Sequence, residues 1–288
     1  MPELPEVETV RQGLEPLTIG RTIAQVSVKH PRALRRNAGS AAAFKKSLTG
    51  KKIQKVSRRG KYLWFEFDDS HLLLVAHLGL SGQFRPTAKN VRHERMRIKF
   101  ADDLPSLSFC DQRTFGGLYL DEWAATTPVP SSISHIALDP FDSAFELDPV
   151  IERTRTKQVP IKAALLDQTL ISGVGNIYAD ESLWRSKIHP LTRASALTRP
   201  RLRELFQNVN DVMSEALGSG GTTFDGLYVS VNGESGAFSQ RLDAYGRGGQ
   251  ACRRCGKKMV REKFANRSSV RCPKCQPVPK SMPRRRAS

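Results

Sequence analysis

The sequence lacks a long apolar run, a secretion signal and internal repeats. No apolar segment approaches the roughly 20 residues of a membrane-spanning helix, so we expect no membrane span. Residues Met1–Glu6 are acidic and lack the basic and then apolar order of a secretion signal, which predicts a cytoplasmic protein. With 39% hydrophobic and 26% charged residues, the 288-residue chain has the composition of a globular protein of two or three domains.

Acidic residues are scarce relative to basic ones, 28 against 46, which leaves a net charge of +18. Such an excess predicts an anionic partner, namely nucleic acid, an acidic membrane or an acidic protein. Residues 1–100 carry +12, residues 101–249 carry −6 and residues 250–288 carry +12. A solvated surface accounts for a small excess, but +12 in the last 39 residues favours contact with nucleic acid.

Only five cysteines are present, and four of them form two C-x-x-C pairs. Sixteen residues separate the pair Cys252 and Cys255 from the pair Cys272 and Cys275, which is the spacing of a two-knuckle zinc site. Two disulfides are the alternative, but they require an oxidising compartment, and the absent secretion signal argues against one. We therefore expect one structural Zn²⁺, closed by four thiolates and without chemistry of its own. Cys110, in an apolar stretch, is expected to be buried and unreactive.

Hydrophobic patterning predicts a helix followed by many short strands. Apolar residues recur at helical spacing over residues 3–14, which indicates an amphipathic helix. Seven β-branched or aromatic-rich segments follow and predict a sandwich or barrel. These are Thr22–Val28, Lys51–Val56, Lys61–Phe67, Leu72–Leu78, Arg95–Phe100, Leu107–Cys110 and Leu118–Leu120. In Arg95–Phe100 the alternate residues Met96, Ile98 and Phe100 are expected to point inward, and the Pro- and Ser-rich stretch Pro128–Ser134 predicts a linker.

After about residue 145 the pattern becomes helical. Ile161–Leu166 is expected to form a short buried helix, and Asn176 is expected to cap a helix through Ile177–Lys187. A long amphipathic helix is expected to end at Gly218–Gly221. Residues 219–240 are rich in Gly and Ser and predict a loop.

Four motifs occur in order along the chain: Pro2–Thr9 (PELPEVET), Gly173–Ala179 (GVGNIYA), Gly220–Thr223 (GGTT) and Tyr245–Arg247 (YGR). On these motifs, and over residues 2–276, the chain resembles the bacterial formamidopyrimidine-DNA glycosylases. The resemblance implies an α+β multidomain fold. Its parts are an N-terminal β-sandwich with an N-terminal helix, a helical helix–two-turn–helix domain and a C-terminal four-cysteine zinc finger hairpin.

The resemblance also predicts domain limits and a partner. We expect a catalytic domain at 1–134, a helix–two-turn–helix DNA-binding domain at 135–244, the zinc finger at 245–276 and a basic disordered tail at 277–288. Residues 219–240 correspond to the family's loop over the flipped base, where flexibility suits a lid. The implied partner is double-stranded DNA containing oxidised bases or abasic sites, bound by a monomer in the bacterial cytoplasm at the nucleoid.

The resemblance assigns the nucleophile to the secondary amine of Pro2, which is exposed only if Met1 is removed. A neutral amine can displace the base from the sugar and leave an iminium that permits elimination of the flanking phosphates. Glu3 corresponds to the family's proton-transfer glutamate, and Glu6 to a supporting group behind it. Without the resemblance, Pro2 is a helix-start residue, and both glutamates complement the helix dipole.

Three further residues correspond to contacts with the lesion or the phosphates. Lys61 matches a family lysine near the lesion, although a surface lysine at a strand start is the alternative. Asn176 and Arg267 match a phosphate clamp, and a helix-capping role for Asn176 is compatible with it because helix N-termini bind phosphate.

Base flipping leaves a gap that must be filled, and the family uses three residues for it. They correspond to Leu80, Arg113 and Phe115, of which Phe115 can wedge into the stack and Arg113 can hydrogen-bond the unpaired cytosine. Core packing is the alternative for Leu80 and Phe115. Many relatives carry methionine in place of Leu80, and Gln112 and Thr114 depart from the frequent Pro and Arg.

The function implied is base-excision repair by a bifunctional glycosylase and abasic-site lyase that acts on oxidised purines. An endonuclease VIII-like enzyme for oxidised pyrimidines is the nearest alternative, but Leu4 and the Gly220–Thr223 motif favour the purine branch. The sequence also leaves open a non-catalytic zinc-ribbon DNA-binding protein and an RNA-binding protein.

Overall fold

The computed structural model describes residues 2–68, 71–222 and 238–279. The chain divides into two compact units, Met1–Ile136 with Ala216–Ser239 and Ala137–Glu215 with Gln240–Ser288. Among the helices of the described ranges, none is both long enough and apolar enough to cross a membrane.

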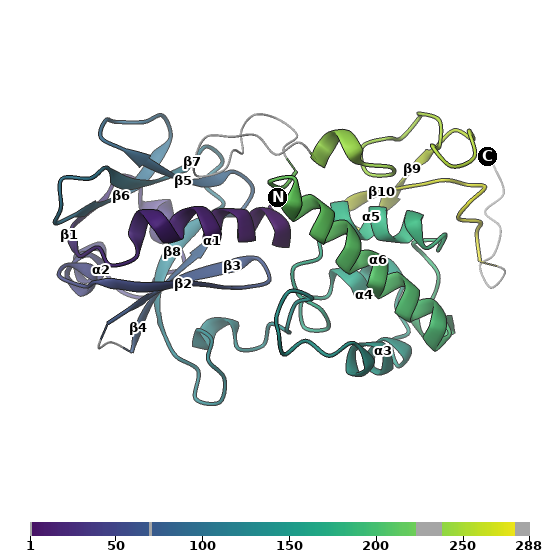
Figure 1. Ribbon diagram of the computed structural model, residues 1–288, viewed down its shortest axis with the longest axis horizontal. Helices are drawn as coiled ribbons and strands as arrows, with labels where there is room; N and C mark the ends of the chain where they lie inside the picture. Colours follow the sequence, from purple (N-terminus) through teal and green to yellow (C-terminus); the bar gives the residue numbers. More distant parts are fainter. Residues whose placement is uncertain (1, 69–70, 223–237, 280–288) are drawn as a thin grey trace. The chain divides into compact units, whose positions relative to one another are not determined.

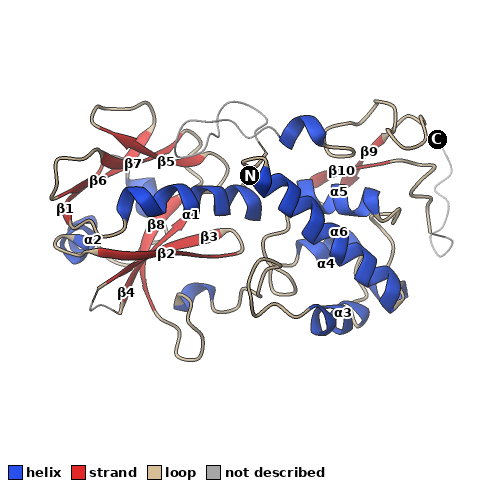
Figure 2. Cartoon of the chain, viewed as in Figure 1, coloured by secondary structure: helices blue, strands red, loops and turns tan. Residues whose placement is uncertain are grey.

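Two four-stranded antiparallel sheets build the first unit (Figure 2). One sheet has the order β1 (Ile23–Val28), β6 (Glu94–Phe100), β7 (Ser106–Asp111) and β5 (Gly82–Thr87). The other has the order β2 (Ile53–Arg59), β3 (Tyr62–Phe67), β4 (Leu72–His77) and β8 (Gly117–Glu122). Apolar side chains from both sheets form one core, so the predicted β-sandwich is confirmed.

Helix α1 (Leu4–Thr18) lies along the sandwich between the two sheets (Figure 1). Its residues Val7, Val10 and Leu14 are at most 1% exposed and belong to the sandwich core. The helix continues one turn beyond the predicted end at residue 14, through Pro16, and ends at Thr18. The Thr18 hydroxyl donates to the Leu14 carbonyl at 2.8 Å within that last turn.

Strand β6 has the predicted alternation, because Met96, Ile98 and Phe100 are 1 to 2% exposed. In the first unit, the sequence did not predict strand β5 or helix α2 (Ala41–Leu48). Helix α2 begins after Ser40, whose hydroxyl accepts a hydrogen bond from Ala43 N at 3.1 Å, and it buries Phe44 and Leu48. A single 3₁₀ turn, η1 (Pro31–Leu34), precedes α2.

The predicted linker at 128–134 lies at the end of the first unit, which extends to Ile136, and it packs against the sandwich. Val129 and Ile133 are each 1% exposed and pack against Trp64, Val75 and Tyr119 on the outer face of the second sheet. A short 3₁₀ turn, η2 (Ser131–Ile133), lies within the segment. This Pro- and Ser-rich segment is therefore tightly turned and packed where described.

Helices and one hairpin build the second unit (Figure 2). Its elements are α3 (Leu147–Arg155), α4 (Ile161–Leu166), α5 (Asn176–Arg185), η3 (Ala194–Ala196), α6 (Arg199–Gly218), β9 (Val260–Phe264) and β10 (Arg267–Arg271). The last three residues of α6, after Glu215, belong to the first unit. The predicted short buried helix and the predicted long amphipathic helix are confirmed as α4 and α6. The predicted loop at 219–240 is wrong at its end, because residues 238–240 belong to a 3₁₀ turn, η4 (Phe238–Arg241). Residues 223–237 of that loop and 280–288 of the predicted tail lie outside the described residues.

Candidate active site and zinc centre

The N-terminal end of α1 gathers Pro2, Glu3 and Glu6 into one buried group. The residues Glu3 and Glu6 are each 2% exposed. Glu6 Oε2 accepts a hydrogen bond from Glu3 N at 2.9 Å, which fixes the backbone next to Pro2. The positive end of the helix dipole lies at the same place and disfavours protonation of an amine on residue 2. Met1 lies outside the described residues.

Glu6 also connects this helix start to the Gly220–Thr223 motif. Its second oxygen, Oε1, accepts a hydrogen bond from Thr222 N at 2.9 Å. Gly221 adopts a φ of +85°, and a Cβ on it would lie 3.3 Å from Glu6 Cγ. The motif therefore places a glycine backbone against the Glu6 side chain, and one carboxylate holds both Glu3 and Thr222.

Lys61 lies on the turn between β2 and β3 and is 8% exposed, so the exposed surface lysine is excluded. Gly60 has a φ of +56°, which the tight turn requires. Arg58 Nε donates to Glu8 Oε2 of α1 at 2.8 Å, and Arg58 Nη1 donates to the Gly60 carbonyl at 3.2 Å. Burial raises the pKa of Glu8, but the guanidinium groups of Arg11 and Arg58 outweigh it and leave that pKa below its usual value.

His77 is a site residue that the sequence did not single out. It pairs with Tyr62 across β3 and β4, with ring centroids 4.9 Å apart, and its Nδ1 accepts from Gly79 N at 3.2 Å. Burial and the nearby cations Arg36 and Lys61 lower the pKa of His77 to about 3. The imidazole is therefore neutral at physiological pH and serves as a hydrogen-bond acceptor for the turn that carries Leu80.

Leu80, Arg113 and Phe115 come from two turns of the sandwich and are all exposed. Leu80 is 37% exposed and Phe115 is 48% exposed, so the core-packing alternative is wrong for both. Ser81 Oγ and Asp111 Oδ1 each accept a hydrogen bond from Arg113 N, at 3.1 and 3.2 Å. The structure thus brings the three predicted gap-filling residues together on one unit.

Asn176 and Arg267 are associated through the β9–β10 hairpin of the second unit. Asn176 Nδ2 donates to the Ser268 carbonyl at 3.0 Å, next to the exposed Arg267. The predicted capping role is wrong, because Gly175 is the N-cap of α5 and Asn176 is its first helical residue. The side chain of Asn176 is directed at the hairpin instead, and its Oδ1 is buried without a hydrogen-bond partner in the described chain.

A buried ion pair holds the same hairpin to the helices. Lys162 Nζ of α4 lies 2.7 Å from Asp180 Oδ1 of α5, with side chains that are 0% and 1% exposed. Asp180 also accepts from Ser269 Oγ at 2.7 Å and from Val270 N at 3.0 Å. Lys162 Nζ also donates a hydrogen bond to the Ser268 carbonyl at 3.2 Å. The ion pair is thus surrounded by hydrogen-bonding groups and by the Phe264 ring, whose centroid lies 5.2 Å from Lys162 Nζ, and these contacts offset the cost of burying the charges.

Glu181, the next residue of α5, holds the chain that enters the zinc finger. Its carboxylate accepts three backbone hydrogen bonds, from Asp243 at 2.9 Å and from Ala244 and Tyr245 at 2.8 Å. Burial raises the pKa of the Glu181 carboxyl, and the three N–H donors oppose that rise. Neither Asp180 nor Glu181 was singled out from the sequence, although two adjacent acids on an apolar helix were a usable signal.

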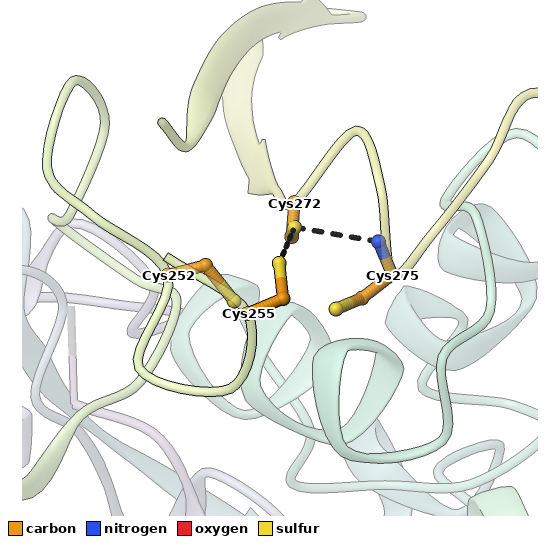
Figure 3. A group of neighbouring side chains, drawn as sticks. All are labelled: Cys252, Cys255, Cys272 and Cys275. Atoms are coloured by element: carbon orange, nitrogen blue, oxygen red, sulfur yellow. Dashed lines mark hydrogen bonds between the residues drawn. The ribbon is translucent and has the colours of Figure 1, made fainter. Parts of the chain in front are cut away.

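The four predicted zinc ligands converge from two tight turns (Figure 3). The Sγ atoms of Cys252, Cys255, Cys272 and Cys275 all lie within 4.8 Å of one another. Tetrahedral Zn–S bonds of about 2.3 Å would place the sulfurs roughly 3.8 Å apart, so the cluster fits one zinc ion with little adjustment. Cys110 is separate, 6% exposed, and burial raises its pKa to about 11, so it is the unreactive thiol that was predicted.

Trp184 of α5 packs directly against the zinc site. Its Nε1 donates to Cys252 Sγ at 3.4 Å, and the guanidinium carbon of Arg254 lies 3.9 Å from its ring centroid. Arg254 Nη1 donates in turn to the Trp184 carbonyl at 3.0 Å. The metal-binding turn is therefore oriented by a helix side chain, as outer contacts of metal sites commonly are.

Comparison with known families matches all three parts of this architecture. Residues 1–118 match the formamidopyrimidine-DNA glycosylase N-terminal domain, 136–226 match the formamidopyrimidine-DNA glycosylase H2TH domain, and 249–278 match a zinc finger found in FPG and IleRS. Together the fold, the buried N-terminal group and the four-cysteine site define a DNA glycosylase with a zinc finger. The chain belongs to the formamidopyrimidine-DNA glycosylase family, whose enzymes are glycosylases and abasic-site lyases.

Relatives and solved structures agree with this membership. The formamidopyrimidine-DNA glycosylase of Acidothermus cellulolyticus is 54% identical over 283 residues, which cover 97% of this chain and 99% of that one. The enzyme of Salinispora arenicola is 52% identical, with 97% and 98% covered. The crystal structure of MutM (Fpg) from Thermus thermophilus has a TM-score of 0.84 at 36% identity, covering 96% of this chain and 98% of that one. Lactococcus lactis Fpg bound to abasic-site DNA has a TM-score of 0.82 at 34% identity, with 95% and 99% covered.

Proposed function

We propose that this chain removes oxidised purines, namely 8-oxoguanine and formamidopyrimidines, from duplex DNA and then cleaves the strand at the abasic site by β,δ-elimination. The observation that carries the proposal is the buried start of α1, where Pro2 adjoins Glu3 and where Glu6 holds Glu3 N and Thr222 N. Solved Lactococcus lactis relatives are complexes with Fapy-dG and abasic-site DNA, which supports the same substrate class here.

Once Met1 is removed, the Pro2 nitrogen attacks C1′ of the damaged nucleotide. The bond from C1′ to the base breaks, and the base leaves with the electron pair and gains a proton. Opening of the sugar gives an iminium on Pro2. Loss of a C2′ proton then breaks the C3′–O bond, and a second elimination breaks the C5′–O bond. Glu3, adjacent to the amine and buried, transfers the protons in these steps.

Cations and amides of both units hold the DNA backbone in this proposal. Lys61 acts near the lesion from the β2–β3 turn, which the Glu8–Arg58 contact fixes. Asn176 and Arg267 bind phosphate, and the hydrogen bond from Asn176 Nδ2 to the Ser268 carbonyl orients the Asn176 amide beside Arg267. These contacts provide position rather than sequence specificity.

The exposed set Leu80, Arg113 and Phe115 fills the gap that base flipping leaves. Phe115 wedges between bases, and Arg113 donates hydrogen bonds to the unpaired cytosine. Leu80 replaces a more flexible methionine of many relatives with a side chain of similar volume, which keeps the wedge apolar.

Zn²⁺ bound by Cys252, Cys255, Cys272 and Cys275 supplies structural order to the hairpin that carries Arg267. Four thiolates leave no open coordination position. The protein acts as a monomer in the cytoplasm, at the nucleoid, where its substrate DNA is found.

Borohydride trapping on duplex DNA with a defined abasic site tests the proposal. The Met1-processed protein is expected to form a covalent adduct, and Pro2→Gly, which keeps a terminal amine without the ring, is expected to form much less. Pro5→Ala is the matched control, because it removes a first-turn proline that is not the nucleophile. Absence of an adduct with processed wild-type protein would falsify the Pro2 mechanism. Faster excision of thymine glycol than of 8-oxoguanine opposite cytosine would assign the enzyme to the pyrimidine branch.

A further inference from the structure

Two turns of the sandwich meet backbone against backbone at the three gap-filling residues. One turn joins β4 to β5 at residues 78–81, and the other joins β7 to β8 at residues 112–116. A Cβ on Gly79 would lie 2.4 Å from Gly116 N, and a Cβ on Gly116 would lie 2.9 Å from the Leu78 carbonyl. Because no methyl group fits between the turns, their relative position is sterically defined.

A single buried carboxylate joins the two turns. Asp111 is 1% exposed, and its Oδ1 accepts from Ser81 Oγ of the first turn at 2.5 Å and from Arg113 N of the second at 3.2 Å. Its Oδ2 accepts from Gly116 N at 2.7 Å. Ser81 is itself 5% exposed, and its Oγ also accepts a hydrogen bond from Arg113 N at 3.1 Å. Hydrogen bonds to a charged acceptor are stronger than those between neutral groups, so the Asp111 carboxylate holds both turns firmly.

The second turn is also held from outside, in a strained conformation. Thr114 has a φ of +55°, which is unfavourable for a β-branched residue. Arg35 Nη1 donates to the Thr114 carbonyl at 3.3 Å, and Arg35 Nη2 donates to the Phe115 carbonyl. Such strain persists only where the surrounding structure over-determines the backbone.

We propose that Asp111 is a positioning residue that keeps Leu80, Arg113 and Phe115 as a preformed set and thereby determines discrimination of the base opposite the lesion. Because Asp111 is only 1% exposed, it acts through the backbone of Arg113 and Gly116 and through Ser81. This inference rests on the proposed function, in which Arg113 reads the unpaired cytosine. A guanidinium that is displaced by a fraction of an ångström loses that hydrogen-bond geometry.

Asp111→Asn tests the proposal, because the amide keeps the size of the side chain and replaces one acceptor with a donor. The measurement is single-turnover excision of 8-oxoguanine opposite cytosine and opposite adenine. Wild type is expected to favour cytosine, and Asp111→Asn is expected to reduce the cytosine rate so that the cytosine-to-adenine ratio falls by about tenfold. Ser81→Ala removes the hydrogen bonds between the turns that the Ser81 hydroxyl forms. It is expected to shift the ratio in the same direction by less, and it replaces Asp111→Asn as the test if that variant does not fold.

Glu94→Gln is the matched control. Glu94 is a buried carboxylate of the same sheet, on β6, that accepts from Arg97 Nε at 2.6 Å and lies outside both turns. It is expected to lower the thermal stability without changing the ratio. Equal reduction of both rates in Asp111→Asn and Ser81→Ala, unchanged rates, or a wild type without preference for cytosine would each overturn the inference. Absence of excision by wild type with either partner base would instead contradict the proposed function.

Discussion

Glu6 and Thr222, 216 residues apart in the sequence, are joined by a hydrogen bond of 2.9 Å from Thr222 N to Glu6 Oε1. The other Glu6 oxygen holds Glu3 N, so the proposed proton-transfer residue and Thr222 of the Gly220–Thr223 motif share one carboxylate. The contact depends on Gly221, whose φ of +85° turns the backbone toward Glu6.

Gly221→Ala is expected to disturb this contact and to destabilise the protein. A side chain at this φ is strained, and its Cβ would press on Glu6 Cγ from 3.3 Å. Gly39→Ala is the matched control, since Gly39 has a φ of +87° with nothing within 4 Å of the added Cβ. We expect a loss of about 1 kcal/mol for Gly39→Ala and about 1 kcal/mol more for Gly221→Ala, with reduced trapping only in the latter. Equal losses in chemical denaturation would contradict a role for the Glu6 contact.

Zinc removal is expected to change the fluorescence of Trp184 and to weaken DNA binding by about tenfold or more, while the β-sandwich keeps its strand content. Trp184 Nε1 is 3.4 Å from Cys252 Sγ, whereas the other two tryptophans, Trp64 and Trp123, belong to the first unit. Titration with a chelator, followed by emission and by circular dichroism, measures both effects. Trp184→Phe should abolish the emission change, and an affinity that survives chelation would contradict the structural role of the metal.

His77 is expected to make stability fall in mild acid. Its pKa of about 3 in the folded state lies below the usual 6.5, so between these values the unfolded chain binds a proton that the folded chain does not. Stability is therefore fully present above pH 6.5 and decreases as the pH falls toward 3. His77→Asn keeps an acceptor for Gly79 N and does not titrate. Denaturation at about pH 7 and about pH 5 should show a larger loss for wild type than for the variant, and parallel losses would refute the assignment.

Arg267→Ala is expected to weaken duplex binding by the same factor for damaged and undamaged DNA and to lower the salt slope by about 1. Arg267 is exposed at the start of β10, where Asn176 contacts the neighbouring Ser268 carbonyl. Arg203→Ala removes an equal charge from α6, where the side chain pairs with Asp148, and serves as the control. Binding isotherms at several salt concentrations measure the slope. Two variants with the same slope would show that the effect is one of net charge.

Elements whose own residues carry the pattern were predictable, and elements that depend on tertiary pairing were not. Strand β6 alternates cleanly, and the C-x-x-C spacing alone defined the zinc ligands. Strand β5 contains Pro86 and pairs only with β7 at a sheet edge, so its sequence resembles a turn. Helix α2 does carry a signal in its sequence, because the Ser40 cap precedes Phe44 and Leu48, which lie four residues apart.

In the candidate site, too, some residues could be predicted from the sequence, and others are defined only by tertiary contacts. The resemblance supplied Pro2, Glu3 and the exposed set, but it did not single out Asp111, because only the meeting of two turns makes that strand-end carboxylate a shared acceptor. Asn176 was predicted to cap α5 from its position alone. The nearby hairpin offers its amide a carbonyl partner at Ser268, and this tertiary contact replaces the local one.

Asp180 and Glu181 occupy consecutive positions of α5, and consecutive helical residues point about 100° apart. One carboxylate holds the β9–β10 hairpin, and the other holds residues 243–245, where the chain enters the zinc finger. The zinc finger is therefore attached to α5 on two of its faces. It cannot rotate about either attachment without breaking the hydrogen bonds of the other.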